Sequence, residues 1–179
     1  MIKNEHQYRV TQYWVERFSQ AITSLRQNEE KREKDPDGWQ LLQDSHQSQL
    51  NALREEITEY ETLTAHDPNQ PVRLTITEIN KLSDVLIKAR IALKLSQKEL
   101  GYLCDACGSD YVLRTEEEIK QYEAADYQNA SFVDVLAVSY ALGIKIQEGV
   151  FIAELDDFYK SRLAEVSGAQ LAQQIMVSP

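Results

Sequence analysis

Cys104 and Cys107, separated by two residues in Cys-Asp-Ala-Cys, form the first pair whose types and spacing could do chemistry. Such a pair binds zinc or cycles between dithiol and disulfide. Zinc needs four ligands, and the chain has no further cysteine and no histidine pair among His6, His46 and His66. The redox motif needs a βαβ context, which is absent. We therefore expect two small, partly buried thiols beside a turn, with a zinc site shared between two chains as the alternative.

No other combination of residues predicts catalysis. The sequence has no nucleophile–base pair, no glycine-rich phosphate loop and no metal constellation. We therefore expect a protein that is not an enzyme, with no catalytic residues, no metal and no cofactor.

Composition excludes several further classes. The 179 residues include 19 Lys+Arg and 29 Asp+Glu, a net charge of -10, which argues against a basic nucleic-acid coat or a polybasic membrane binder. No apolar run approaches the roughly 20 residues of a membrane span, and the first residues have no apolar signal core. We expect a cytoplasmic protein with no membrane partner. With 6 glycines, 4 prolines and few turn signals, an all-β fold is disfavoured, so the expected class is mostly α.

Two amphipathic helices are predicted in the first 70 residues, at 11–31 and 39–64, joined by the turn Asp35-Pro36-Asp37-Gly38. Apolar residues recur in both at three- and four-residue spacings, as in a coiled coil. The result is an antiparallel helical hairpin, whose stripe is either core, or the seam of an oligomer, or both. We interpret His46 on this stripe as a core histidine. The second stripe consists of Trp39, Leu42, His46, Leu50, Leu53, Ile57 and Tyr60.

Residues 71–145 predict short helices with clear start signals. A first helix is expected at 81–93. Capping boxes, in which a hydroxyl and a carboxylate three residues apart satisfy each other's backbone N–H groups, are predicted at Ser96/Glu99, Thr115/Glu118 and Ser131/Asp134. Gly143 is the expected C-cap of the last helix.

Short capped helices with tight connections are typical of a helix-turn-helix domain. The segment LIKARIALKLSQKEL (86–100) resembles the Cro/CI-type (XRE) repressor family, and 119–127 and 136–143 are similar to its third helix with the exit loop and to its fourth helix. The resemblance covers 80–143 and implies a phage-repressor-like domain. The preceding hairpin and the opening Tyr8-Arg9-Val10-Thr11 resemble an antitoxin-like subset of bacterial regulators.

The resemblance also implies a set of DNA contacts. Gln97 is similar to the family glutamine that bonds a phosphate, and Thr115 caps the expected recognition helix. Base-reading and phosphate-contacting side chains are expected on that helix, while the exit loop and the N-terminus of the next helix touch the backbone. The implied set is Lys94, Gln97, Lys98, Thr115, Glu116, Glu117, Lys120, Gln121, Tyr127, Gln128, Asn129 and Ser131.

Charge and spacing give this interface two unusual features. Residues 81–98 contain five positive residues and one negative residue, Asp84, which is a local excess of four positive charges. We interpret this excess either as the electrostatic footprint of DNA binding or as a solvated helix face. The expected recognition helix begins with three glutamates at 116–118, which suit the helix dipole but oppose phosphates. The 29 residues of 95–123 also exceed the family's spacing of about 21, so the turn is longer. The five positive residues are Lys81, Lys88, Arg90, Lys94 and Lys98.

The chain is thus expected to have three parts: a helical hairpin and dimerisation region (1–70), a helix-turn-helix domain (71–145) and a C-terminal piece (146–179). The alternating segments 71–76 and 145–152 predict a small two-stranded pairing. An amphipathic helix is expected at 153–166.

We therefore expect a sequence-specific DNA-binding transcription regulator that acts as a homodimer on a palindromic operator. Its half-sites would lie roughly 34 Å apart. The alternative is an antitoxin-like protein-interaction module that retains the fold, binds DNA weakly or not at all, and has a toxin or another protein as its partner.

Overall fold

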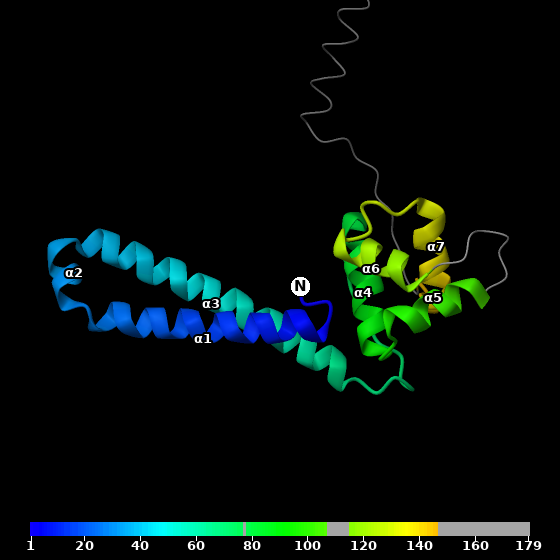
Figure 1. Cartoon of the computed structure of the whole chain (residues 1–179), viewed down its shortest axis with the longest axis horizontal. Helices are drawn as coiled ribbons and strands as arrows, with labels where there is room; N and C mark the ends of the chain where they lie inside the picture. The colour runs from blue at the N-terminus through cyan, green and yellow to red at the C-terminus, as the bar shows by residue number, and fades with distance from the viewer. Residues whose placement is uncertain (77, 107–114, 147–179) are drawn as a thin grey trace, which may run out of the picture. The chain divides into compact units, whose positions relative to one another are not determined.

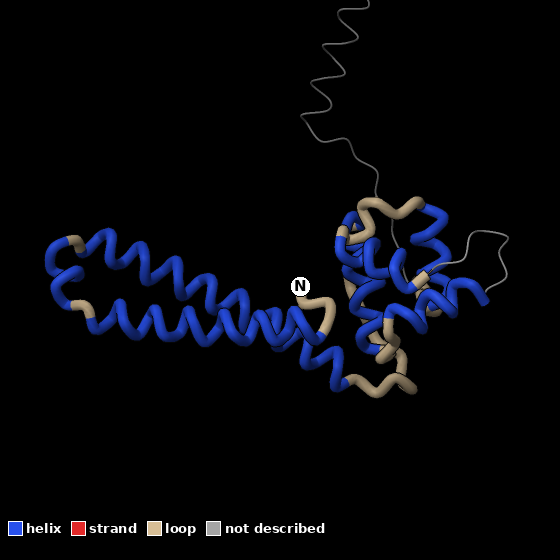
Figure 2. The backbone as a smooth tube through the Cα atoms, viewed as in Figure 1, coloured by secondary structure: helices blue, strands red, loops and turns tan. Residues whose placement is uncertain are grey.

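A computed structural model describes residues 1–76, 78–106 and 115–146. These residues are mostly helical and contain no β-strand (Figure 1; Figure 2). None of the described helices combines the length and the apolar character that crossing a bilayer requires. Met1–Ile144 forms one compact unit. The helix predicted at 153–166 and most of the strand predicted at 145–152 lie outside the described residues.

The first helices are α1 (Glu5–Gln27), the short α2 (Glu29–Lys34) and α3 (Pro36–Ala65). The prediction of a turn at 35–38 was wrong, because Asp35 caps α3 and residues 36–38 are its first turn. The Asp35 side chain accepts a hydrogen bond from the Gly38 N–H, and Pro36 occupies the first helical position, where its missing N–H has no cost. The chain instead reverses through α2, which is capped by the Asn28 side chain.

Helices α1 and α3 run alongside each other in opposite directions, and we call them the helical pair (Figure 1). Their contact buries Ile22 on α1 and Leu50 on α3. The Trp39 indole N–H donates to the Leu25 carbonyl over 2.8 Å, and the His46 ring lies 5.7 Å from the Phe18 ring, centroid to centroid. His46 is therefore a packing residue.

Four short helices follow the 3-10 turn Ile79–Lys81. They are α4 (Leu82–Ala92), α5 (Gln97–Ala106), α6 (Glu116–Ala124) and α7 (Phe132–Ala141). The capping boxes predicted from the sequence are formed at α6 and α7, and the Ser96 and Glu99 side chains bond reciprocally at α5. The C-cap of α7 is Leu142, one residue before the predicted Gly143. Gly143 follows it at a φ of 64°, a left-handed conformation that favours glycine. The start signals of these helices were therefore read correctly.

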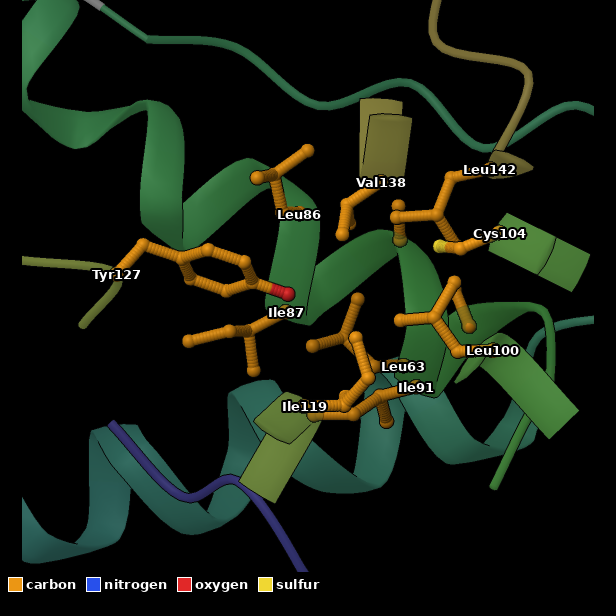
Figure 3. Close-up of a cluster of buried hydrophobic side chains, with 12 residues drawn as sticks. Leu63, Leu86, Ile87, Ile91, Leu100, Cys104, Ile119, Tyr127, Val138 and Leu142 are labelled. Carbon is orange, nitrogen blue, oxygen red and sulfur yellow. The ribbon is translucent and has the colours of Figure 1, made fainter. Parts of the chain in front are cut away.

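The four helices enclose one hydrophobic core, drawn in Figure 3. Leu86 and Ile87 of α4, Leu100 of α5, Ile119 of α6 and Val138 of α7 have no exposed surface. Each lies on the inward face of its helix. The arrangement leaves the opposite faces of α5 and α6 available at the surface.

The segment 71–76 does not form the predicted strand. Val72 and Leu74 pack against the helical core instead, so their alternation reflects one face on the helices and one on solvent. The prediction that 71–76 pairs with 145–152 was therefore wrong for 71–76, because residues 71–76 are not part of a β-sheet.

Candidate nucleic-acid interface

The N-terminus of α5 is fixed by its cap. The Glu99 carboxylate accepts from the Ser96 N–H at 2.8 Å and from the Ser96 hydroxyl at 2.7 Å, and the Glu99 N–H donates back to that hydroxyl at 3.1 Å. These bonds hold the pKa of Glu99 below its usual value. Glu99 therefore caps the N-terminus of α5, while the Lys98 side chain beside it is exposed.

The three glutamates that begin α6 have different roles. Glu118 accepts from the Thr115 N–H at 2.8 Å and completes the cap. Glu116 lies 2.7 Å from the Lys120 ammonium, and this contact lowers the pKa of Glu116 and raises that of Lys120. Glu117 is exposed. The helix start is thus less repulsive to an anion than three free carboxylates would be.

A buried polar network joins α4, α5 and α6. The Arg90 guanidinium bonds both carboxylate oxygens of Glu123, at 2.5 and 2.8 Å, and Glu123 has no exposed surface. The Gln97 side-chain amide donates to the same carboxylate at 2.7 Å. Because all three bonds converge on one α6 residue, the angle between α5 and α6 is held by directional contacts as well as by packing.

The same network reaches the N-terminal residues. Arg90 also donates to the carbonyls of Leu95 and Lys3, each at 2.9 Å. The Lys3 ammonium bonds the Glu123 carbonyl at 2.5 Å and the Asp126 carboxylate at 2.7 Å. The residues before α1 are therefore part of the support of α6.

The positive footprint predicted at 81–98 is smaller than the sequence indicates. Arg90 is buried against Glu123, and Lys88 pairs with Glu59 on α3. Lys94 and Lys98 remain exposed at either side of the α5 cap.

The backbone places Lys94 at a sharp corner. Its φ is 57°, and the N–H groups of Lys94 and Leu95 donate to Ile91 and Arg90 at 3.0 Å each, which closes the end of α4. Lys98 lies near the start of α6, where its charge contributes to the lowered pKa of Glu116. The two lysines thus flank the α5 N-terminus.

The loop after α6 corrects one candidate contact. Tyr127 is only 6% exposed and belongs to the core, so its ring is not presented to a surface partner (Figure 3). Asp126 and Tyr127 take left-handed φ values of 48° and 58°, which turns the ring inward. Burial raises the pKa of the Tyr127 hydroxyl, for which the described residues provide no hydrogen-bond partner.

The other loop candidates are at the surface. Gln128 and Asn129 are exposed, and Ser131 caps α7 by accepting from the Asp134 N–H at 3.2 Å. Glu116, Glu117, Lys120 and Gln121 are the outward residues of α6. With the exception of Tyr127 and the partly buried Gln97, every candidate contact is solvent-exposed.

Sequence reasoning missed the Arg90–Glu123 pair. A signal was present, because Glu123 lies four residues after the buried Ile119 and so on the inward face of α6. A carboxylate at such a position needs a cation.

The cysteines give no site in the described residues. Cys104 is 5% exposed and packs in the core, while Cys107 lies outside the described residues. No group of His, Cys, Asp or Glu suited to a metal occurs among 1–76, 78–106 and 115–146.

Comparisons of the chain with protein-family models, with curated proteins and with solved structures found no match.

Proposed function

We propose that this protein is a helix-turn-helix transcription regulator that binds duplex DNA sequence-specifically as a homodimer, and that it is not an enzyme. The observation that carries the proposal is the α5–α6 arrangement. Gln97 and Arg90 converge on Glu123 from inside, while the opposite face of α6 presents polar side chains beside Lys98. Rigid positioning of a polar helix face is what base reading needs.

In this account α6 enters the major groove. Two pairs of residues, each spaced by one helical turn, share the exposed face of α6: Glu116 with Lys120, and Glu117 with Gln121. A glutamine amide can bond adenine through two bonds, and a glutamate can accept from the cytosine amino group. The Glu116–Lys120 pair opens when each finds a DNA partner.

Phosphate contacts come from the surroundings of α6. Lys94 and Lys98 supply charge, and Gln97 has a second amide N–H besides the one it donates to Glu123. Gln128, Asn129 and the N–H groups of the first turn of α7, next to Ser131, lie beyond the end of α6. These contacts fix the register and leave sequence reading to α6.

Salt dependence tests the proposal. Two protomers that each place Lys94 and Lys98 on phosphates release about four counterions, so log K against log salt should have a slope of about -3 to -4. Affinity for duplex DNA should then fall roughly 100-fold between 50 and 200 mM salt. Fluorescence anisotropy of a labelled duplex measures this. A salt-independent affinity, or no binding at 50 mM salt, would contradict the proposal.

A second function is favoured by one observation, the outward face of α7. Phe132, Leu136 and Tyr140 recur at four-residue spacing and are 72%, 51% and 75% exposed. Exposed apolar side chains in a row are typical of protein-interaction surfaces. The alternative is accordingly an antitoxin-like module that binds a toxin or another protein through α7. Its partner binding should change little with salt.

A further inference from the structure

The two sides of the helical pair differ in chemistry. The positions of contact between the helices are buried or half-buried residues spaced three or four apart. They include Thr11, Val15, Phe18, Ile22 and Leu25 on α1, and Trp39, Gln43, His46, Leu50, Leu53, Ile57 and Tyr60 on α3. Two helices that run in opposite directions are related by an approximate two-fold axis perpendicular to the plane that contains them. Residues that directly precede a contact position therefore lie on one side of the pair in both helices, and residues that directly follow it lie on the other side.

The following side is polar throughout. It contains five charged residues and no apolar one. Water covers such a surface without cost, so it needs no partner. Its members are Gln12, Glu16, Ser19, Thr23 and Arg26 on α1, and Gln40, Asp44, Gln47, Asn51, Arg54, Thr58 and Glu61 on α3.

The preceding side, which we call the apolar face, has the opposite character. Val10, Trp14 and Leu42 are 42%, 48% and 37% exposed there. Ala21, Ser45, Gln49 and Ala52 separate them, and all four are uncharged.

Little formal charge opposes contact at the apolar face. Of the charged residues there, Glu56 bonds the Met1 ammonium at 2.8 Å and Glu59 pairs with Lys88. Arg17 is then the one charge on the apolar face, among the described residues, with no ion pair.

The symmetry of the apolar face indicates what covers it. In a two-fold dimer the same surface occurs on both subunits and must be complementary to itself. The approximate two-fold axis that relates α1 to α3 passes through the apolar face. A second copy placed on this face therefore brings the same largely uncharged side chains against it. Two chains of net charge -10 repel each other elsewhere, but not at a surface with so little charge.

The size of the apolar face fits such a dimer. The 23 residues of α1 extend for about 35 Å, and two helices of about 10 Å diameter side by side give roughly 700 Å² of surface. Stable interfaces bury about 800 Å² on each partner. The apolar face thus approaches what one standard interface needs.

We propose that a second copy of this chain covers the apolar face, so that two helical pairs form a four-helix bundle with Trp14 and Leu42 at its centre. This inference rests on the homodimer of the proposed function and assigns its interface. It does not depend on DNA binding.

A pair of charge-adding variants tests the assignment. Trp14→Glu with Leu42→Glu places carboxylates on the apolar face, and Gln12→Glu with Ser48→Glu adds the same charge at exposed positions away from it. Sedimentation equilibrium between 1 and 100 μM should give twice the 20.6 kDa chain mass for the native chain and for the control. The apolar-face variant should dissociate at least 100-fold more easily. Native-like dimerisation of that variant, or a monomeric native chain at 100 μM, would overturn the inference.

Trp14 provides a second readout in case the variant does not fold. The chain has two tryptophans, and Trp39→Phe leaves Trp14 as the only tryptophan, whose emission is excited selectively over that of the tyrosines. Its emission should shift to the blue, and iodide should quench it less, as the concentration crosses the dimerisation range. Unchanged emission in a chain that does dimerise would overturn the assignment. A dimer that shows these effects but binds no DNA would instead refute the proposed function and leave this inference standing.

Discussion

Replacing Glu123 with alanine should lower the free energy of unfolding by about 3–5 kcal/mol, because it leaves the Arg90 charge buried without a partner. Arg90 is 7% exposed and Glu123 is fully buried, so water does not replace the lost carboxylate. Gln97 also loses its partner, since its side-chain amide donates to the Glu123 carboxylate, whereas Lys3 keeps its bond to the Glu123 main-chain carbonyl. Urea unfolding followed by far-UV circular dichroism measures the change.

Two further variants make this result specific. Glu117→Ala on the exposed side of α6 should change the free energy of unfolding by no more than about 0.5 kcal/mol. Arg90→Met combined with Glu123→Leu removes both charges and should recover most of the loss, because no charge then remains buried. A Glu123→Ala variant as stable as Glu117→Ala would show that the pair does not stabilise α6.

Reversing two charges, Lys94→Glu with Lys98→Glu, should abolish binding to any duplex. Both side chains are exposed beside the start of α5, and each reversal replaces attraction to a phosphate by repulsion. We expect a loss of at least roughly 100-fold in affinity at 50 mM salt, measured by fluorescence anisotropy.

The matched control is Lys31→Glu with Lys34→Glu on α2. It changes the net charge of the chain by the same amount, at residues outside the proposed interface. If only general charge mattered, both double variants would lose affinity equally. Binding that survives the reversal of Lys94 and Lys98 would mean that the phosphate contacts lie elsewhere.

Local signals in the sequence predicted the short helices well. Thr115 with Glu118 and Ser131 with Asp134 form the expected boxes, because capping depends on residues three apart and not on distant packing. The mostly helical class followed from the spacing of apolar residues for the same reason.

Features that depend on distant residues could not be predicted. The sequence alone predicts a surface charge at Arg90, because its partner Glu123 is 33 residues away. The sequence alone predicts Tyr127 as a surface contact, because the left-handed backbone at 126 and 127 is not evident from the residue types. Apolar and polar residues alternate over 71–76 as in a β-strand. The apolar ones, however, pack against the helical core and not against a second strand.

Selection from a random-sequence duplex library tests the central claim most directly. A homodimer that reads bases through α6 should enrich a palindrome whose half-sites lie about one helical turn, roughly 34 Å, apart. Gln121→Ala should relax the preference at one symmetric pair of positions while the palindrome remains. The account would be contradicted if the native protein bound duplexes from the library but the bound duplexes showed no enrichment of any sequence.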